Sequence, residues 1–442
     1  MLKQFSRSDF LTLAVLLVAF AAGAWKVAQR AEPAGFVAEA APSPIRTLKT
    51  KPGQVLSPDG NFRFDAQFVS AAPGQAVHAA SMVELTNGDL RAVWFSGSRE
   101  GAGDVTLQTA VMDADTGRWG IESTLIDRVQ LQRGLQRYVK KLGNPVIGRA
   151  ADGSLLLWMV NVSLGGWAGS SVSWVRSIDE GLTWSRPQRL VTSPFLNIST
   201  LPKGAPVRMD DGHLSLPVYH EFFTKFAELL LLNVDGKVVD KVRIPGSQTS
   251  LQPVIMVSSP NNAQVYMRSG TASAVMTSTT KNAGKTWSVS RPTALPNPDS
   301  AVAGVATLGG IQWMALNPGH RNREQLALIR TQLGGSFDGQ SLWRVEASAS
   351  PEARLSRPQY ERLLSRELAA ASASPAQAEA YVLSAMRQLC NEQECAQEYS
   401  YPYLLQGRDG SLHLIYTWHR TRIKHIRLDP LQPALAMNAL IQ

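Results

Sequence analysis

Two stretches of this 442-residue sequence share one pattern, Ser177-Ile-Asp-Glu-Gly-Leu-Thr-Trp184 and Thr280-Lys-Asn-Ala-Gly-Lys-Thr-Trp287. Each extends a strand-like run, SSVSWVRS in the first case and ASAVMTST in the second. The Asp or Asn side chain caps turn amides, the Gly adopts a conformation closed to other residues, and the Trp packs beneath the hairpin. The pattern therefore predicts a tight turn between two β-strands, with Trp184 and Trp287 as structural anchors rather than catalytic groups.

A second repeat has a longer period. Six turn dipeptides precede apolar strand-like runs: Asn87-Gly88, Asp152-Gly153, Asp211-Gly212, Asn261-Asn262, Gly309-Gly310 and Asp409-Gly410. Such dipeptides suit two-residue hairpins, and the first four gaps are each about the length of a four-stranded propeller blade. Degraded copies of the Trp-containing pattern occur at 115–119 and 336–343. We expect an all-β chain, a six-bladed β-propeller spanning residues 61–442.

The last gap between turn dipeptides is about twice the others, which predicts an insertion. Residues 357–395 are rich in Leu, Ala, Glu and Arg without strand alternation, so we expect two helices there, exposed and dispensable for the core. The only cysteines, Cys390 and Cys395, could close a small loop in an oxidising compartment. Because a second cysteine pair is missing, we expect no metal site, and no cofactor either.

The N-terminus resembles an export signal in composition. Lys3 and Arg7 precede an apolar run from Phe10 to Trp25 that contains a small-x-small pattern at 22–24. Residues 1–30 are therefore interpreted as a signal peptide or an N-terminal membrane anchor, and the Ala- and Pro-rich residues 31–60 as a flexible tether. Either version predicts a periplasmic or other extracytoplasmic location, with an inner membrane as partner if the segment is retained.

The net charge of the chain indicates which classes of ligand to expect. A formal net charge of +9 favours anionic ligands such as acidic glycans, although a scattered excess also serves solubility. Nucleic acid is not expected, since no run of Lys and Arg interleaves with aromatic residues in the propeller region.

The pattern Ser-x-Asp-x-Gly-x-Thr-Trp resembles the Asp-box, or BNR repeat, of the sialidase (neuraminidase) superfamily. Several segments between about residues 75 and 430 resemble its exo-α-sialidase branch, among them HAASMVEL, FSGSREGAGDV, KLGNPVI, LPNPDSAV, EYSYPYLLQ and YTWHRTRIKH. The resemblance implies an active site at one end of the propeller channel. It also implies hydrolysis of a glycosidic bond to sialic acid or another acidic sugar.

The resemblance also implies roles for individual residues. It implies Asp104 as the general acid/base and Arg99 as a substrate-binding arginine on the same loop. Arg268 and Arg323 resemble two arginines of the triad that binds the substrate carboxylate, with Arg321 a close rival of Arg323. Guanidinium groups bind carboxylates bidentately, which explains why such sites use arginine.

The nucleophile position is less clear-cut. Tyr399 resembles the sialidase tyrosine, with Tyr401 a rival two residues on, on the same face if the segment is a regular strand. The glutamate that should activate this tyrosine is replaced by Gln252, which cannot accept a phenolic proton. Glu221, with His220 beside it, is a candidate substitute.

Other departures and additions concern substrate binding. The first triad arginine is missing from the strand that contains His78, a residue that could act as an acid, a ligand or a core hydrogen-bonding group. Further polar positions resemble the exo-α-sialidase branch and are expected around the same funnel: Lys141, Asn144, Lys203, Asn297, Arg420 and Lys424.

These observations predict an exported glycan-active enzyme, a sialidase-type glycoside hydrolase acting on an acidic carbohydrate. Two alternatives stay open. One is a non-catalytic glycan-binding propeller of the cell envelope. The other is a polysaccharide lyase on uronic-acid glycans, with His78 or a tyrosine as its base.

Overall fold

The computed structural model describes residues 7–28, 34–37, 55–56, 62–70, 75–193, 197–319, 322–347, 354–370 and 374–430. The chain divides into two compact units, Met1–Ala34 and Gly35–Gln442. The first contains helix α1, Arg7–Ala28. No helix within the described ranges is both long enough and apolar enough to cross a lipid bilayer. Lys3 and most of the predicted tether lie outside those ranges, so export and anchoring stay predictions.

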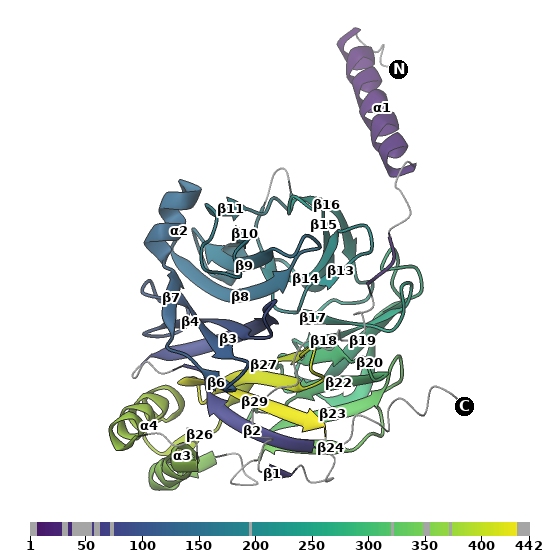
Figure 1. Ribbon diagram of the computed structural model, residues 1–442. Helices are drawn as coiled ribbons and strands as arrows, with labels where there is room; N and C mark the ends of the chain where they lie inside the picture. Colours follow the sequence, from purple (N-terminus) through teal and green to yellow (C-terminus); the bar gives the residue numbers. More distant parts are fainter. Residues whose placement is uncertain are drawn as a thin grey trace, which may run out of the picture. The chain divides into compact units, whose positions relative to one another are not determined.

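The second unit is the predicted six-bladed β-propeller (Figure 1). From the innermost strand outward, blade 1 contains β3 (Ala76–Glu84), β4 (Leu90–Gly97), β5 (Thr106–Asp113) and β6 (Arg118–Trp119), with β7 (Ser123–Ile126) also on β5. Blade 2 contains β8 (Lys141–Arg149), β9 (Leu155–Val162), β10 (Ser170–Ser177) and β11 (Gln188–Arg189). In blade 3, β12 (Leu201–Pro202) and β13 (Val207–Arg208) both pair with β14 (Leu214–Glu221), followed by β15 (Lys225–Leu232) and β16 (Val238–Arg243).

The remaining blades complete the ring. Blade 4 contains β17 (Ser250–Val257), β18 (Ala263–Ser269), β19 (Ala274–Thr280) and β20 (Arg291–Pro296). Blade 5 contains β21 (Ala303–Ala306), β22 (Ile311–Leu316), β23 (Leu326–Gln332) and β24 (Leu342–Glu346). Blade 6 contains β27 (Tyr399–Gln406), β28 (Leu412–Trp418), β29 (Arg422–Pro430), β2 (Phe62–Phe68) and β1 (Val55–Leu56).

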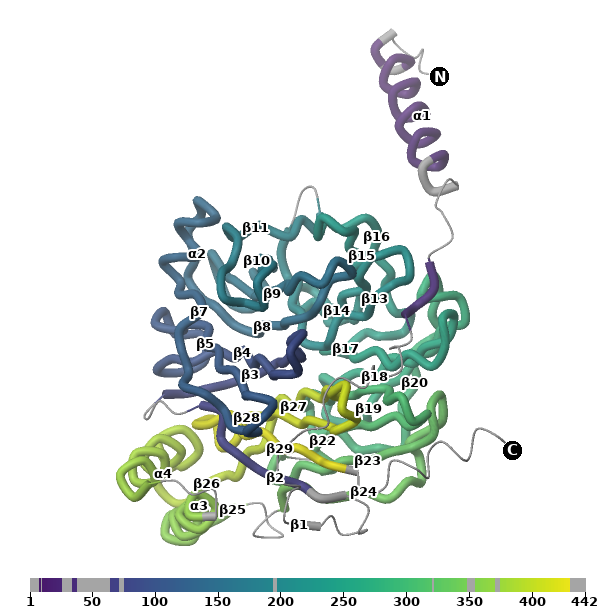
Figure 2. The backbone as a smooth tube through the Cα atoms, viewed as in Figure 1, coloured from purple at the N-terminus to yellow at the C-terminus, as the bar shows by residue number. Residues whose placement is uncertain are grey.

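Blade 6 joins the two ends of the propeller sequence. Strand β2 comes from the N-terminal side and pairs with β29 near the C-terminus, from Phe62 opposite Pro430 to Phe68 opposite Lys424. The colour gradient of Figure 2 shows the same closure, with purple chain beside yellow chain. A ring closed in this way leaves no open edge between its first and last blades.

The predicted turns lie where the sequence indicates. All six turn dipeptides connect the first and second strands of their blades, and the second residue of five of them is a glycine with positive φ, for example 93° at Gly88. In the first Asp-box, Asp179 accepts hydrogen bonds from the backbone N and the Oγ1 of Thr183, at 2.9 and 2.5 Å. In the second, Asn282 accepts one from Thr286 N at 2.9 Å. Trp287 is buried, while Trp184 is only partly buried.

The antiparallel strand order separates two ends of the propeller. Both Asp-boxes connect a third strand to a fourth strand, so they share an end with the dipeptides between first and second strands. The starts of the first strands and the ends of the second strands lie at the opposite end. We call these the Asp-box end and the channel-mouth end.

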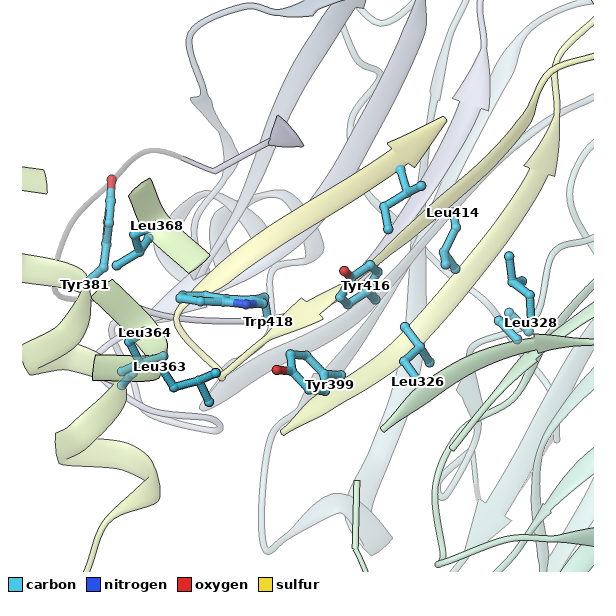
Figure 3. Packing of buried hydrophobic residues seen from close by; sticks show 14 of the residues in the cluster. Leu326, Leu328, Leu363, Leu364, Leu368, Tyr381, Tyr399, Leu414, Tyr416 and Trp418 are labelled. Atoms are coloured by element: carbon cyan, nitrogen blue, oxygen red, sulfur yellow. The ribbon is translucent and has the colours of Figure 1, made fainter. Parts of the chain in front are cut away.

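The predicted insertion consists of α3 (Arg357–Ala370) and α4 (Pro375–Leu389), flanked by the paired strands β25 (Arg354–Ser356) and β26 (Glu394–Ala396). Cys390 and Cys395 form a disulfide beside it. The helices are confirmed, but the expectation that the core does not need them is wrong. Leu363, Leu364 and Tyr381 pack in one hydrophobic cluster with Tyr399 and Trp418 of blade 6 (Figure 3).

One part of the predicted tether is attached to the propeller. Phe36 is 2% exposed, its N donates to Pro260 O at 2.7 Å, and it forms an isolated bridge with Met209. Residues 35–37 therefore lie against blades 3 and 4.

Candidate active site

The innermost strands share an irregularity near their first residues. Strands β3, β8, β17 and β27 each shift register against the second strand of their blade. The shifted segments contain residues with left-handed backbone: Ala79, Asn144, Gln252 and Tyr401, with φ of 55°, 36°, 52° and 53°. A bulge breaks the strand alternation and re-aims side chains. Since neighbouring inner strands contact one another around the ring, the bulges direct these side chains to one place at the channel mouth.

Tyr401 lies at the centre of this group. Gln252 Nε2 donates a hydrogen bond to Tyr401 Oη at 3.2 Å, and Arg268 Nη1 donates to Gln252 Oε1 at 3.1 Å. Arg268 also forms a salt bridge with Asp299 at 2.6 Å. The structure thus brings together three predicted site residues from strands β17, β18 and β27, in a group that we call the channel cluster.

Tyr219, on β14, is a member of the channel cluster that sequence reasoning missed. Its hydroxyl accepts a hydrogen bond from Asn144 Nδ2 at 3.1 Å, and burial raises its pKa well above the usual range. Nothing in its sequence context, an apolar strand ending in Tyr-His-Glu, distinguishes it from a core tyrosine. Asn144 occupies the position that the resemblance implies.

Lys203 is a buried cation beside Tyr401. Its side chain lies in the segment between β12 and β13, is 3% exposed, and donates from Nζ to Pro402 O at 2.9 Å. Nζ also lies 5.9 Å from the ring centroid of Tyr401 and 5.5 Å from that of Tyr403. Burial lowers the pKa of Lys203 to about 7, because the charged form loses its hydration. This ammonium group therefore exchanges its proton near neutral pH.

His78 lies against the other side of Tyr401, with 4.1 Å between ring centroids. The side chain is buried, and burial together with the charge of Arg420 lowers its pKa well below the usual value. It is therefore a neutral imidazole at neutral pH. Its Nδ1 is buried and has no hydrogen-bond partner within the described part of the chain. A buried polar atom without such a partner is uncommon in a folded protein.

Two further predicted arginines converge on a carboxylate. Glu398 accepts from Arg420 Nε at 2.8 Å and from Arg323 Nη1 at 3.4 Å. These three residues extend the channel cluster, since their charges act on His78 beside Tyr401. Burial opposes ionisation of Glu398, but the charges of Arg420 and Arg323 lower its pKa to about 2. Glu398 was missed, although it directly precedes the predicted Tyr399. Arg321, the rival of Arg323, lies outside the described residues.

Glu221 ends β14 at the same end of the propeller. Burial raises the pKa of its carboxyl group, against the opposing charges of Lys225 and Arg268. A carboxyl group in this state can hold a proton at a higher pH than an exposed one. His220 is directed elsewhere: its Nε2 lies 3.0 Å from Glu228 and its ring stacks on Phe226.

The loop after β4 reaches the channel cluster through a different residue from the predicted one. Asp104 is exposed, and its carboxylate accepts from N and Oγ of Ser98 at 3.1 and 3.0 Å. Glu100, from the same loop, lies 3.7 Å from Arg420 Nη1. Arg99 and Lys141 line a separate cavity beside the channel cluster. The assignment of Asp104 as acid/base stays a prediction.

The two candidate tyrosines have different environments. Tyr399 is completely buried between blade 6 and the insertion (Figure 3). Its hydroxyl donates to Glu367 Oε1 at 3.1 Å. The register shift between Ser400 and Tyr403 removes the common face that a regular strand would give Tyr399 and Tyr401. The structure therefore places Tyr401, and not Tyr399, in the channel cluster, and the identity of the nucleophile stays a prediction.

Two remaining candidates lie outside the channel cluster. Asn297 is buried and holds its own loop, donating to Ser300 O at 2.9 Å, which positions Asp299. Lys424 forms a salt bridge with Glu346 at 2.5 Å. A search of the described ranges finds no group of three or more His, Cys, Asp or Glu residues suited to a metal ion.

The chain is similar to one protein-family model and to several solved structures. A family model described as a BNR repeat-like domain matches residues 88–414. No curated protein sequence matches the chain. Among solved structures, the Hadza microbial sialidase Hz136 is similar at 14% identity and a TM-score of 0.58, covering 80% of this chain and 66% of that one.

Two other solved structures are similar over nearly their whole length. A protein of unknown function from Dyadobacter fermentans has 10% identity and a TM-score of 0.60, covering 83% of this chain and 98% of that one. The intramolecular trans-sialidase from Ruminococcus gnavus has 12% identity and a TM-score of 0.57, covering 83% and 99%. At such identities the likeness establishes the propeller fold alone.

Proposed function

The chain belongs to the BNR repeat-like family, and from this premise we propose that it is a glycoside hydrolase acting on an acidic sugar. The observation that carries the proposal is the hydrogen-bonded series Arg268–Gln252–Tyr401 at the channel mouth. It combines a cation for a carboxylate with a tyrosine hydroxyl in one place. Sialidases and a trans-sialidase among the structural neighbours support the same class of substrate.

Tyr401 acts as the nucleophile. Glycosidases of sialidase type use tyrosine in this role instead of a second carboxylate. Gln252 donates to Tyr401 Oη and so stabilises negative charge there, but it cannot remove the phenolic proton. Lys203, whose pKa of about 7 leaves its side chain partly as neutral amine and whose Nζ lies 5.9 Å from the Tyr401 ring centroid, accepts that proton as Tyr401 Oη bonds to the anomeric carbon.

Glu221 acts as the general acid. Burial raises the pKa of its carboxyl group and so favours the protonated form, which delivers a proton to the departing oxygen, as environment-tuned carboxyls do in other glycosidases. In the second half of the reaction the resulting carboxylate takes a proton from the water that releases the sugar. Arg268 binds the substrate carboxylate through its guanidinium group.

The same reaction would take place outside the cytoplasm. The disulfide between Cys390 and Cys395 supports this location, since such bonds persist mainly in oxidising compartments. The basic and apolar composition of residues 1–30 supports it independently.

A second candidate is a polysaccharide lyase. The specific observation in its favour is that Lys203, buried beside Tyr401 with a pKa of about 7, can accept a proton near neutral pH. A lyase needs such a base to remove the proton next to a uronate carboxylate.

The test uses the full chain on a panel of aryl glycosides and oligosaccharides of sialic and uronic acids. A hydrolase releases a saturated reducing sugar, and Tyr401→Phe should lower turnover at least about 10³-fold. Products that absorb in the ultraviolet would identify a lyase instead. Binding of an acidic glycan without cleavage would reject both, and would support a glycan-binding propeller.

A further inference from the structure

Beside the channel cluster lies a second cavity whose lining is basic. It has a volume of about 450 Å³ and is lined by Arg99, Arg128, Lys140 and Lys141, together with Tyr138 and residues 101–103. The lining comes from the loop after β4, from the first residue of α2 (Arg128–Leu135), and from the chain entering β8. We call it the basic pocket.

The charges of the basic pocket are not balanced in the way that those of the channel cluster are. In the cluster, Arg268 is matched by Asp299, and Arg323 and Arg420 by Glu398. No carboxylate lines the basic pocket. Across the described ranges, no salt bridge joins its four cations to Asp or Glu. Like charges held around one cavity repel one another, and a bound anion relieves that repulsion.

Two of the four cations are also held in place. Arg128 donates from Nε to Gly103 O at 3.0 Å and from Nη1 to Val139 O at 3.2 Å. Lys141 Nζ lies 5.7 Å from the ring centroid of Trp167, in the short helix Trp167–Gly169. Gly101 has a φ of +71°, and the loop passes close to Lys141 at this residue. A Cβ added at Gly101 would lie 3.4 Å from Lys141 Nζ. A site ordered before binding loses less entropy when its ligand arrives.

The basic pocket adjoins the channel cluster on both of its sides. Glu100, between pocket residues Arg99 and Gly101, contacts Arg420 of the cluster. On β8, Lys141 of the pocket is three residues before Asn144 of the cluster, a separation of about 10 Å along a strand. Tyr138 is 54% exposed and offers a ring surface between polar groups.

From this juxtaposition we infer that the basic pocket is a second anion subsite, which binds the acidic group of a neighbouring sugar in the same glycan. The substrate is then a polyanionic glycan, with carboxylates or sulfate esters on consecutive sugars, rather than a neutral chain that ends in one acidic sugar. This inference rests on the proposed function, because it assumes that the channel cluster binds the first acidic sugar.

The test measures affinity against oligomer length by calorimetry, in full-length Tyr401→Phe protein so that ligands are not cleaved. The probes are oligomers of one to four residues of sialic acid, of galacturonic acid, and of a sulfated sugar. We expect the dimer or trimer of one class to bind at least about tenfold more tightly than its monomer. The class that shows the gain identifies the anionic group.

Two pairs of substitutions, each added to the Tyr401→Phe protein, show whether the gain in affinity with oligomer length comes from the basic pocket. Adding Arg99→Gln and Lys140→Gln should remove it. Adding Lys237→Gln and Lys281→Gln, which makes the same change in net charge at exposed positions of the Asp-box end, should leave it intact. A gain that survives in the first double variant, or no gain in any class, overturns the inference.

The two proposals fail separately. One outcome is that the wild type cleaves no glycan while longer oligomers still bind more tightly, and the Arg99→Gln and Lys140→Gln changes remove that gain in affinity. In that case the hydrolase proposal fails and the second subsite stands. If wild type cleaves an acidic glycoside and no gain appears, only the second subsite is rejected.

Discussion

The Asp-box end and the channel-mouth end of this propeller use the same backbone device for different purposes. Glu180 and Ala283 in the boxes adopt left-handed backbone, as do Asn144, Gln252 and Tyr401 at the channel mouth. In the boxes, the side-chain caps of the turn join residues at most four apart, such as Ser177 with Gly181, and longer-range bonds such as Arg91 Nε to Glu180 O add to them. At the channel mouth, the bond between Gln252 and Tyr401 joins residues 149 apart.

This difference separates stability from chemistry. A turn held by its own neighbours forms wherever its sequence occurs, and its Trp adds buried apolar area. The channel mouth instead combines backbone strain, a buried lysine, and a neutral histidine with an unpartnered nitrogen. Such features each reduce stability and are found where function requires them.

The largest expected effect is on turnover at the channel mouth. Glu221→Gln should lower turnover by about 10²–10⁴-fold, because the amide cannot donate a proton to the leaving oxygen. Thermal unfolding should hardly change, since the side chain keeps its shape and loses a carboxyl group whose ionisation burial disfavours. Steady-state kinetics and calorimetric unfolding measure the two quantities. If Asp104→Asn abolishes turnover and Glu221→Gln does not, the acid lies on the exposed loop instead.

At the Asp-box end the effect should fall on stability alone. Trp287→Ala should lower the free energy of unfolding by about 3–5 kcal/mol, because its ring is 6% exposed and leaves a cavity. Trp184→Ala should cost less, since that ring is only partly buried. Urea unfolding measures both changes. Normal stability with lost glycan affinity would place Trp287 in a binding site.

The two tyrosines of β27 make the comparison within a single strand. Tyr399→Phe should destabilise the protein by about 1.5–3 kcal/mol by removing its hydrogen bond to the Glu367 carboxylate, and should leave turnover unchanged. Tyr401→Phe should show the reverse pattern. Loss of turnover in the Tyr399 variant at full stability would restore Tyr399 as the nucleophile.

The smallest expected effect, counted per pH unit, is the change in the free energy of unfolding with pH. Lys203 has a pKa of about 7 when folded, against 10.5 for an ordinary lysine. Between these values the unfolded chain holds a proton that the folded protein lacks, so stability rises with pH, by at most about 1.4 kcal/mol per unit. Lys203→Met should flatten that rise, which urea unfolding at pH 7 to 10 will measure. An unchanged slope would show that Lys203 is solvated.

The same contrast explains which parts of the molecule the sequence predicted. The six blades and the helices at 357–395 follow from turn dipeptides and from the absence of strand alternation, both of which are local patterns. The packing of those helices was not predictable, because Glu367 finds its partners Tyr399 and Trp418 only once blade 6 is formed. The expectation of a dispensable insertion failed for this reason.

The candidate site divides in the same way. The sequence indicated that Arg268, Gln252 and Lys203 belong to the site, through the family resemblance and through the chemistry of their side chains. Tyr219 and Glu398 carried no comparable signal. Whether a buried tyrosine or glutamate is part of a site depends on which blades meet around it.

By itself the sequence determined the Asp-box turns, the six hairpins and the all-β class, because the hydrogen bonds that define them join residues a few positions apart. Only the tertiary structure gives Tyr399 and Tyr401 different surroundings. Two residues apart on a regular strand they would share a face, but the bulge at Ser400–Tyr403 sends one into the insertion core and the other into the channel. Closure of the ring then brings Gln252 and Arg268 from blade 4 to Tyr401.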